Sequence, residues 1–304
     1  MYLSHPTSRL HDMGDGHPER PERVTAVHDA LVAAGLMQRM RSIEAPAATD
    51  EQILRVHSES HLHRLVAASP DEGMAQLDAD TAMNPHSLAA ARHAAGASVR
   101  AVETVIQTSV NRAFCNVRPP GHHAEANQAM GFCLFNSVAV GAAHALEACG
   151  LERVAIVDFD VHHGNGTEDI FADDSRVLMA STFQTPLYPG SGNNPLGPNM
   201  HNQGLPPGAG GDELKRAVQD VWAPAFSAFK PELILISAGF DAHRDDPLAQ
   251  LNFVEADYAW VTEWLVEQSK RWCSGRIVSS LEGGYSLDAL GRSAAAHVQA
   301  LLAR

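Results

Sequence analysis

The sequence predicts an α/β protein whose largely parallel β-sheet is covered by helices on both faces. Short apolar runs rich in β-branched residues, such as residues 154–157, alternate with longer helical patterns along the chain. A strand that is buried on both faces needs apolar side chains at every position rather than at alternate ones. Because parallel strands are joined by crossovers, this alternation predicts right-handed strand–helix–strand units. With no linker or internal repeat, we expect a single domain over residues 1–304.

The first elements are predicted from turn formers and helical patterns. Residues 11–24 are rich in glycine, proline and charge, which favours a surface loop leading into a helix that ends near Gly35. Residues 51–68 also have a helical pattern. We interpret the histidines on that segment as solvated or capping residues rather than metal ligands; they are His57, His61 and His63.

The remaining elements follow from composition and apolar pattern. The alanine-rich run 87–107 is typical of a long helix. The span 185–211 is rich in Gly, Pro and Asn and is too long for a simple connection, which suggests a rim or lid around a site. The expected helices are 23–36, 51–68, 87–107, 136–149, 212–229, 254–271 and 288–303, and the expected strands are 113–117, 154–157, 177–181, 233–237 and 277–281.

Composition excludes several classes of protein. A formal net charge of −14 repels nucleic acid and favours cationic partners. No run approaches the ~18 to 20 apolar residues of a membrane span, and the N-terminal residues lack the apolar core of a signal peptide. The four cysteines form no CxxC pair, so we expect reduced thiols. These features predict a soluble, cytoplasmic protein that binds neither nucleic acid nor membrane.

Four of the predicted strands run directly into polar motifs. The strand at 113–117 leads to RPPGHH at residues 118–123, and the strand at 154–157 leads to DFDVHHGN at residues 158–165. The two other motifs are AGFDAH at residues 238–243 and EGGY at residues 282–285. Parallel strands place their carboxyl ends along one edge of the sheet, where open α/β proteins bind ligands. The four motifs are therefore expected to converge.

A metal ion is the simplest reason for Asp160, His162 and Asp241 to meet. Asp158, Asp160 and His162 are spaced by two, so extended backbone points their side chains the same way. Three protein ligands with open positions are typical of a catalytic zinc site, whereas structural zinc sites are closed by four. Iron(II) also suits this oxygen-rich set. Helix capping or salt bridging is the alternative explanation for the DxDxHH motif alone.

The paired His122 and His123 are candidates for acid–base chemistry, and Tyr285 for an oxyanion donor. A bare histidine pair is more often buried and bonded to loop backbone, but the preceding Pro-Pro-Gly makes the loop rigid. Asp158 offers one ring a charged partner and Asn165 offers the other a neutral one. The carboxylate favours an imidazolium more than the amide does. Tyr285 follows two glycines that allow a sharp turn toward a ligand.

Taken together, the motifs RPPGHH, GFCLFN, DFDVHHGNGT, AGFDAHRDDPL and EGGY, with HPERPER near the N-terminus, resemble the histone deacetylase family. The likeness is to its class II and bacterial deacetylase-like amidohydrolase branch, and it runs from His17 to Tyr285. It implies the arginase/deacetylase fold, a single eight-stranded parallel sheet flanked by helices on both faces. It also implies zinc on Asp160, His162 and Asp241.

The resemblance assigns further residues. Tunnel walls fall on Gly131, Phe132 and Tyr188, and Leu248 occupies the position of an acidic gatekeeper in polyamine-selective relatives. Arg23 matches an arginine near an internal release channel. Structural potassium is implied at two places, which are Asp158, Asp160 and His162 with Ser181, and a second site near Phe171 and Val177.

The expected function is zinc-dependent hydrolysis of an N-acyl amide, most simply acetyl-lysine. His123 is the expected general base, His122 an electrostatic partner and Tyr285 the oxyanion donor. The expected partners are an acetylated protein, a peptide or a small amine, and a homo-oligomer is left open. Two alternatives are an acetylpolyamine deacetylase, which Leu248 argues against, and a non-catalytic acyl-lysine-binding module. An arginase-type manganese enzyme would need more bridging carboxylates.

Overall fold

The structure, a computed structural model that describes residues 1–303, is built around one eight-stranded sheet. The strand order is β2-β1-β5-β10-β9-β6-β7-β8, and every neighbouring pair is parallel. The predicted parallel sheet is therefore confirmed. The strands are β1 (Tyr2–Ser4), β2 (Ser42–Glu44), β5 (Arg112–Cys115), β6 (Val154–Asp158), β7 (Val177–Gln184), β8 (Met200–Leu205), β9 (Leu233–Ala238) and β10 (Ile277–Leu281). A separate antiparallel pair is β3 (Ala75–Gln76) and β4 (Ala82–Met83).

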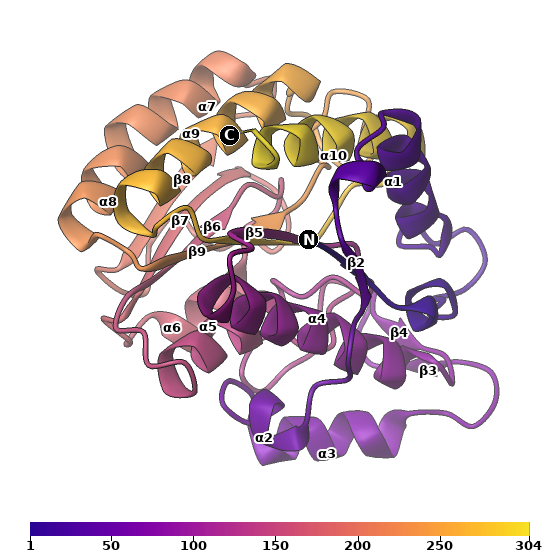
Figure 1. The fold of residues 1–304 in the computed structure, drawn as a ribbon. Coiled ribbons are helices and arrows are strands. Elements are labelled where there is room, and N and C mark those ends of the chain that lie inside the picture. Colours follow the sequence, from indigo (N-terminus) through magenta and orange to yellow (C-terminus); the bar gives the residue numbers. More distant parts are fainter. Residues whose placement is uncertain (304) are drawn as a thin grey trace.

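Helices cover both faces of this sheet, as Figure 1 shows. Along β9, Leu233 and Leu235 belong to one core cluster, whereas Ile234 and Ile236 belong to the other. This alternation explains why a central strand must be apolar at every position. One face is covered by α2 (Asp50–Ile53), α3 (Glu59–Ala68), α4 (Ser87–Gln107), α5 (Ser137–Glu147) and α6 (Asn165–Phe171).

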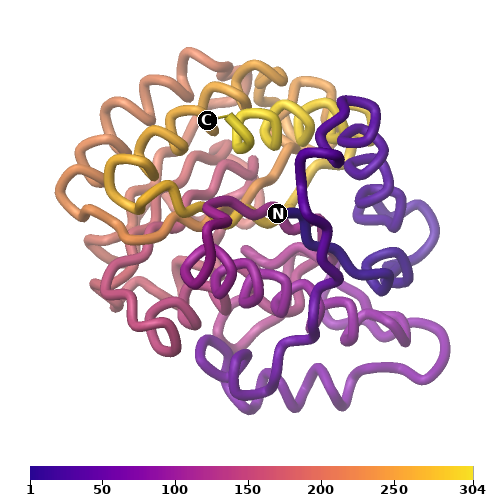
Figure 2. The backbone as a smooth tube through the Cα atoms, in the orientation of Figure 1, coloured from indigo at the N-terminus to yellow at the C-terminus, as the bar shows by residue number. Residues whose placement is uncertain are grey.

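On the opposite face, helices from the two ends of the chain pack together. The N-terminal helix α1 (Glu22–Ala33) packs against α10 (Leu287–Leu301), and α10 packs against α9 (Glu255–Trp272). In Figure 2 the indigo and yellow segments lie side by side for this reason. The same layer contains α7 (Gly211–Ala217) and α8 (Ala223–Phe229). A π-helical turn at Val218–Trp222 links these two, so the helix predicted over 212–229 is interrupted.

The segment 51–68 is two helices rather than one, because Ser58 starts a new helix. Its side chain accepts a hydrogen bond from the backbone amide of His61 at 3.1 Å. His57 and His61 are buried, so their interpretation as solvated residues was wrong, whereas His63 is exposed. Nε2 of His57 accepts from the amide of Asn136 at 2.9 Å. The buried histidines therefore support the loops that follow β5.

The span 185–211 contains strand β8, which the sequence did not predict. Its residues, MHNQGL, lack the β-branched run of the central strands. As the last strand in the sheet order, β8 pairs only with β7 among the described residues. An edge strand needs apolar contacts on fewer sides, so its composition is less distinctive. β1 and β2, at the opposite side of the sheet, were also missing from the predicted strands.

A buried neutral histidine makes the stability of this fold sensitive to acid. Nδ1 of His297 lies 2.7 Å from Oγ1 of Thr262, and Nε2 lies 2.8 Å from Oγ of Ser279. Burial lowers the pKa of His297 from 6.5 to about 3. The unfolded chain therefore binds a proton here at a higher pH than the folded protein does. The resulting stabilisation is present above pH 6.5 and is lost as the pH falls toward 3.

We predict that His297→Gln, which does not titrate, weakens this pH dependence. Between about pH 6.5 and 5, the free energy of unfolding should fall by about 2 kcal/mol less in the variant than in the wild type. Urea denaturation at several pH values measures this difference. The exposed His63→Gln variant serves as the control and should follow the wild type. Parallel curves for His297→Gln and the wild type would contradict the prediction.

Candidate metal centre and active site

Four polar loops meet at the carboxyl edge of the main sheet. They follow β5, β10, β9 and β6, which are consecutive neighbours in the sheet. The loop after β6 carries Asp160 and His162, and the loop after β9 carries Asp241. Ligands of open α/β sheets bind beyond the carboxyl ends of the strands. The predicted convergence of the four motifs is therefore present.

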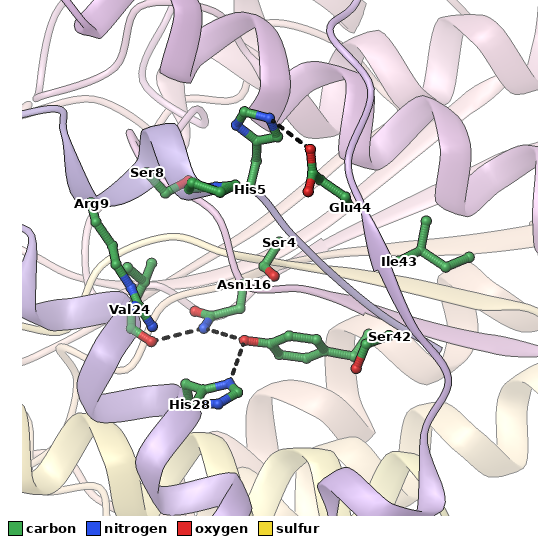
Figure 3. Close-up of a pocket in the computed structure, with 12 residues that line it drawn as sticks. Ser4, His5, Ser8, Arg9, Val24, His28, Ser42, Ile43, Glu44 and Asn116 are labelled. Carbon is green, nitrogen blue, oxygen red and sulfur yellow. Dashed lines mark hydrogen bonds and ion pairs between the residues drawn. The ribbon is translucent and has the colours of Figure 1, made fainter.

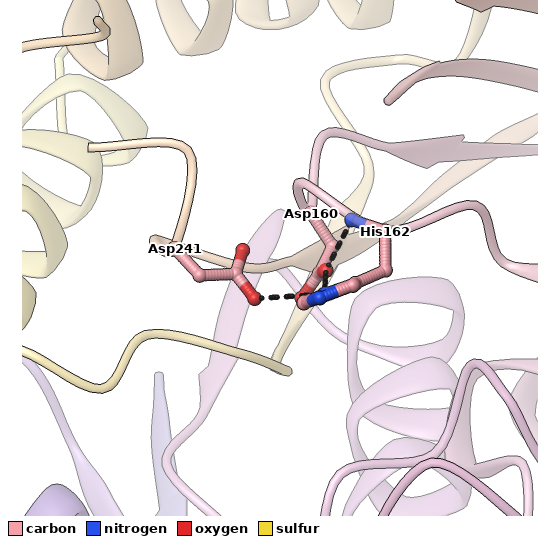
Figure 4. Close-up of side chains that lie close together, drawn as sticks. All are labelled: Asp160, His162 and Asp241. Atoms are coloured by element: carbon pink, nitrogen blue, oxygen red, sulfur yellow. Dashed lines mark hydrogen bonds and ion pairs between the residues drawn. The ribbon is translucent and has the colours of Figure 1, made fainter. Parts of the chain in front are cut away.

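Asp160, His162 and Asp241 form a compact group whose donor atoms all lie within 4.8 Å of one another. Nδ1 of His162 lies 3.0 Å from Oδ1 of Asp160 and 3.2 Å from Oδ2 of Asp241 (Figure 4). Both carboxylates are buried. Within residues 1–303 this is the one group of three such donors. The structure thus brings together the three residues predicted as metal ligands.

The electrostatics of this group favour a bound cation. Burial and the neighbouring charge of Asp160 raise the pKa of Asp241 to about 7, because two carboxylates away from water repel each other. Among the described residues, Oδ2 of Asp241 accepts no well-aligned hydrogen bond and has Nδ1 of His162 only as an ion-pair neighbour at 3.2 Å, whereas Oδ1 accepts from the backbone amide of Val161 at 2.9 Å. A divalent cation would offset both charges and bind that oxygen. The donor set suits zinc, and iron(II) as well.

Two glycines make the close packing around these carboxylates possible. A Cβ at Gly239 would overlap Oδ2 of Asp160, and a Cβ at Gly283 would overlap Oδ2 of Asp241. The backbone amide of Gly283 also donates to Oδ2 of Asp160 at 2.8 Å. Any larger residue at either position would displace a carboxylate. The glycines of the AGFD and EGGY motifs therefore hold the metal-binding geometry.

His122 and His123 have different partners and different proton affinities. Nδ1 of His122 lies 2.9 Å from Oδ2 of Asp158, and Nδ1 of His123 lies 2.7 Å from Oδ1 of Asn165. Burial lowers the pKa of His122, but the charges of Asp158 and Asp160 outweigh it and hold that pKa well above its usual value. Burial and the positive charge of His122 hold the pKa of His123 well below its usual value. The pair therefore combines a cationic and a neutral imidazole.

Tyr285 lies on a turn that charged side chains hold in place. Its backbone amide donates to Oδ2 of Asp246 at 2.7 Å, and Nε of Arg23 donates to the carbonyl of Gly284 at 2.7 Å. The guanidinium carbon of Arg23 lies 4.8 Å from the centre of the Tyr285 ring. Gly284 has a φ of 120°, which favours glycine. Burial raises the pKa of Tyr285 well above its usual value despite the charge of Arg23, so the phenol keeps its proton.

Three of the four predicted tunnel residues pack against His123 or Tyr285. A Cβ at Gly131 would overlap the ring of His123, and Phe132 packs edge-on against Tyr285 with 5.9 Å between ring centroids. Tyr188 packs edge-on against His123 at 5.2 Å. Leu248 is half-buried, and its backbone amide donates to Oδ1 of Asp246 at 3.0 Å. Gly131, Phe132 and Tyr188 thus lie at the site.

A cavity adjoins α1, the helix that carries Arg23. It has a volume of about 380 Å³, and Figure 3 shows the polar groups on its wall. Nδ2 of Asn116 donates to the hydroxyl of Tyr2 at 2.8 Å and to the carbonyl of Val24 at 2.9 Å. Arg9 also lines the cavity. Arg23 is not among the residues that line this cavity, so the release channel that the resemblance implies near Arg23 stays a prediction.

Residues 11–24, predicted to form a surface loop, instead contribute a buried charge network. His11, Glu19 and Arg23 are fully buried. The carboxylate of Glu19 accepts hydrogen bonds from the guanidinium groups of Arg118 and Arg23. Burial opposes the charge on Glu19, but Arg118 and His11 hold its pKa well below the usual value. Glycine, proline and charge are also typical of exposed loops, so only the HPERPER resemblance could have indicated this network.

The residues implied for potassium lie in two separate places. Ser181 lies beside Asp158 in the register of β6 and β7. The backbone carbonyls of Phe171 and Val177 both accept hydrogen bonds from Nδ2 of Asn199, at 2.8 and 2.9 Å. Converging carbonyl oxygens are suitable ligands for a hard cation. The amide of Asn199 satisfies these oxygens here, so the second potassium site stays a prediction.

Comparison with known proteins agrees with this geometry. Residues 17–301 match the family model of the histone deacetylase domain. The chain is 38% identical over 278 residues to the histone deacetylase-like amidohydrolase of Pseudomonas aeruginosa, covering 89% of this chain and 73% of that protein. It is 37% identical over 286 residues to a probable deacetylase of Archaeoglobus fulgidus, covering 91% of this chain and 79% of that protein. The crystal structure of the HDA15 HD domain aligns with a TM-score of 0.91 and 36% identity, over 99% of this chain and 87% of that one.

The chain belongs to the histone deacetylase family, and its fold is the arginase/deacetylase fold. It is therefore a histone deacetylase-family hydrolase with a candidate metal site formed by two carboxylates and an imidazole. Among residues 1–303, no helix is both long and apolar enough to cross a membrane.

We predict that Glu19→Gln lowers the free energy of unfolding by about 3 to 5 kcal/mol, because it leaves two buried guanidinium groups without a counter-charge. Urea denaturation at neutral pH measures this loss. Glu22→Gln removes a charge from an exposed position three residues away and should change stability by no more than about 0.5 kcal/mol. A Glu19→Gln protein as stable as the wild type would show that the network contributes little.

Proposed function

We propose that this chain is a zinc-dependent amidohydrolase that removes an acetyl group from the side chain of acetyl-lysine. The observation that carries the proposal is that the three candidate metal ligands lie beside the histidine pair. Nε2 of His122 lies 3.7 Å from Oδ1 of Asp160, and the ring centroid of His123 lies 5.7 Å from that of His162. Metal donors, a proton-transfer group and a phenol gathered at one edge of the sheet suit the hydrolysis of an amide.

Each residue has a distinct role in the proposed reaction. A divalent cation held by the three donors would polarise the acyl carbonyl and lower the pKa of the attacking water. His123 removes a proton from that water and later protonates the leaving amine, because its neutral partner Asn165 leaves the ring uncharged. His122 stays cationic beside Asp158 and stabilises negative charge. Tyr285 donates a hydrogen bond to the developing oxyanion.

Two aromatic residues at the site, Leu248 and the net charge of the chain support the proposed substrate. Phe132 and Tyr188 pack against Tyr285 and His123, and they would line the path of an aliphatic side chain. A lysine stem is apolar and ends in the amide that is hydrolysed, so it suits such a path. Leu248 provides no acidic group for a second amine, which favours acetyl-lysine over an acetylpolyamine. The net charge of −14 suits release of a cationic amine.

The remaining predictions from the sequence belong to the same proposal. Structural potassium near Ser181 and near Phe171 and Val177 would stabilise the loops on either side of β7. A cytoplasmic location agrees with an acetylated protein or peptide as the partner.

We predict that the protein hydrolyses acetyl-lysine peptides and that a chelator abolishes this activity until zinc is added back. A panel of acetyl-lysine peptides, acetylputrescine, acetylspermidine and longer acyl-lysines, assayed with and without chelator, measures both properties. Asp241→Asn should stay inactive after zinc is added, because it loses a charged donor. Full activity after complete removal of metal would refute the proposal. Peptide binding without turnover would favour the binding-module alternative.

We also predict that Tyr285→Phe lowers kcat by about 10²-fold or more with little change in KM, because it removes one oxyanion donor. Steady-state kinetics on an acetyl-lysine peptide measure both constants. A thermal midpoint close to that of the wild type would establish that the variant is folded. An unchanged kcat would remove Tyr285 from the reaction.

A further inference from the structure

The side-chain amide of Asn165 lies between His123 and a group of hydrogen-bond acceptors. Its Nδ2 donates to Oε1 of Glu125 at 2.7 Å and to Sδ of Met130 at 3.3 Å. Its Oδ1 lies 2.7 Å from Nδ1 of His123. Asn165 is 8% exposed, so solvent competes little for these positions. The two ends of the amide therefore face chemically different partners.

The carboxylate of Glu125 determines which way this amide points. A carboxylate only accepts hydrogen bonds, so it requires the NH₂ group of Asn165 to face it. The flipped amide would place its oxygen against Oε1 of Glu125, and two acceptors in contact repel each other and lose a hydrogen bond. The oxygen of Asn165 must consequently face His123.

We propose that Glu125 is a positioning residue that, through Asn165, fixes His123 in the tautomer protonated at Nδ1. An amide oxygen only accepts, so Nδ1 of His123 carries the hydrogen and donates it. In a neutral ring the lone pair then lies on Nε2. Nε2 faces away from Asn165, and a general base needs its lone pair on that nitrogen to accept a proton. The catalytic consequence rests on the proposed function, whereas the tautomer does not.

The backbone at Glu125 is held by hydrogen bonds to its neighbours. Nδ1 of His57 lies 3.0 Å from the backbone carbonyl of Glu125, and Oδ2 of Asp169 accepts from the next backbone amide at 2.9 Å. Glu125, Met130 and Asn165 line a cavity of about 420 Å³. A shortened side chain at position 125 therefore leaves solvent-accessible space rather than a closed void. This makes a truncation at position 125 a usable test of the interaction.

The test compares Glu125→Ala with Glu125→Gln. A glutamine can still present an acceptor oxygen to Asn165, whereas an alanine cannot. In the zinc-loaded protein with ¹⁵N-labelled histidines, NMR should show the wild-type His123 ring protonated at Nδ1, and His123→Asn assigns the signal. Glu125→Ala should reduce that tautomer and lower kcat by about tenfold or more with little change in KM, and Glu125→Gln should restore kcat to within about threefold.

Asp169→Asn provides the matched control. It removes a charge from the same cavity but keeps an acceptor for the backbone amide, so the tautomer and kcat should stay as in the wild type. A wild-type His123 protonated at Nε2 would overturn the proposal. A Glu125→Ala protein that keeps both the wild-type signal and kcat within about twofold would overturn it as well. If the wild type hydrolyses no acyl amide, the proposed function fails, and the NMR result still decides the tautomer.

Discussion

The site depends on burying four carboxylates at one edge of a parallel sheet. Asp158, Asp160, Asp241 and Glu282 are all at most 1% exposed. An uncompensated buried carboxylate costs several kcal/mol, so each needs a partner. His122 lies beside Asp158, and two backbone amides of the histidine loop donate to Oε2 of Glu282. Burial and the charge of Asp160 still raise the pKa of Asp241, and a divalent cation would offset the repulsion between these two carboxylates.

A second buried charge network holds the loops that carry the reacting groups. In this network positive groups outnumber the negative one, because the single carboxylate of Glu19 lies between the guanidinium groups of Arg23 and Arg118. Arg118 begins the loop that contains the histidine pair, and Arg23 contacts the turn of Tyr285. Since β5 and β10 are neighbours in the sheet, the network joins two adjacent strand ends. It thereby restricts how the histidine pair and the phenol can move relative to each other.

Sequence patterns located the centre of the site but not its supports. The strand ends could be predicted because a central parallel strand is apolar throughout and polar residues follow it directly. Charge and turn formers are equally typical of exposed loops, so Glu19 was indistinguishable from a surface residue. His57 and His61 were misjudged for a related reason. Their ring nitrogens bind backbone groups of a distant loop, and a local pattern carries no information about such partners.

The sequence by itself determined the parallel α/β architecture, the strands at its centre and the donors that gather beyond their ends. Those features depend on local apolar runs and on the rule that parallel strands share a carboxyl edge. Only the tertiary structure decided which charges are buried together, that edge strand β8 forms within a long loop, and that Asn165 lies between Glu125 and His123. Those features depend on contacts between residues far apart in the chain, where burial changes the energetic cost of a charge or a hydrogen bond.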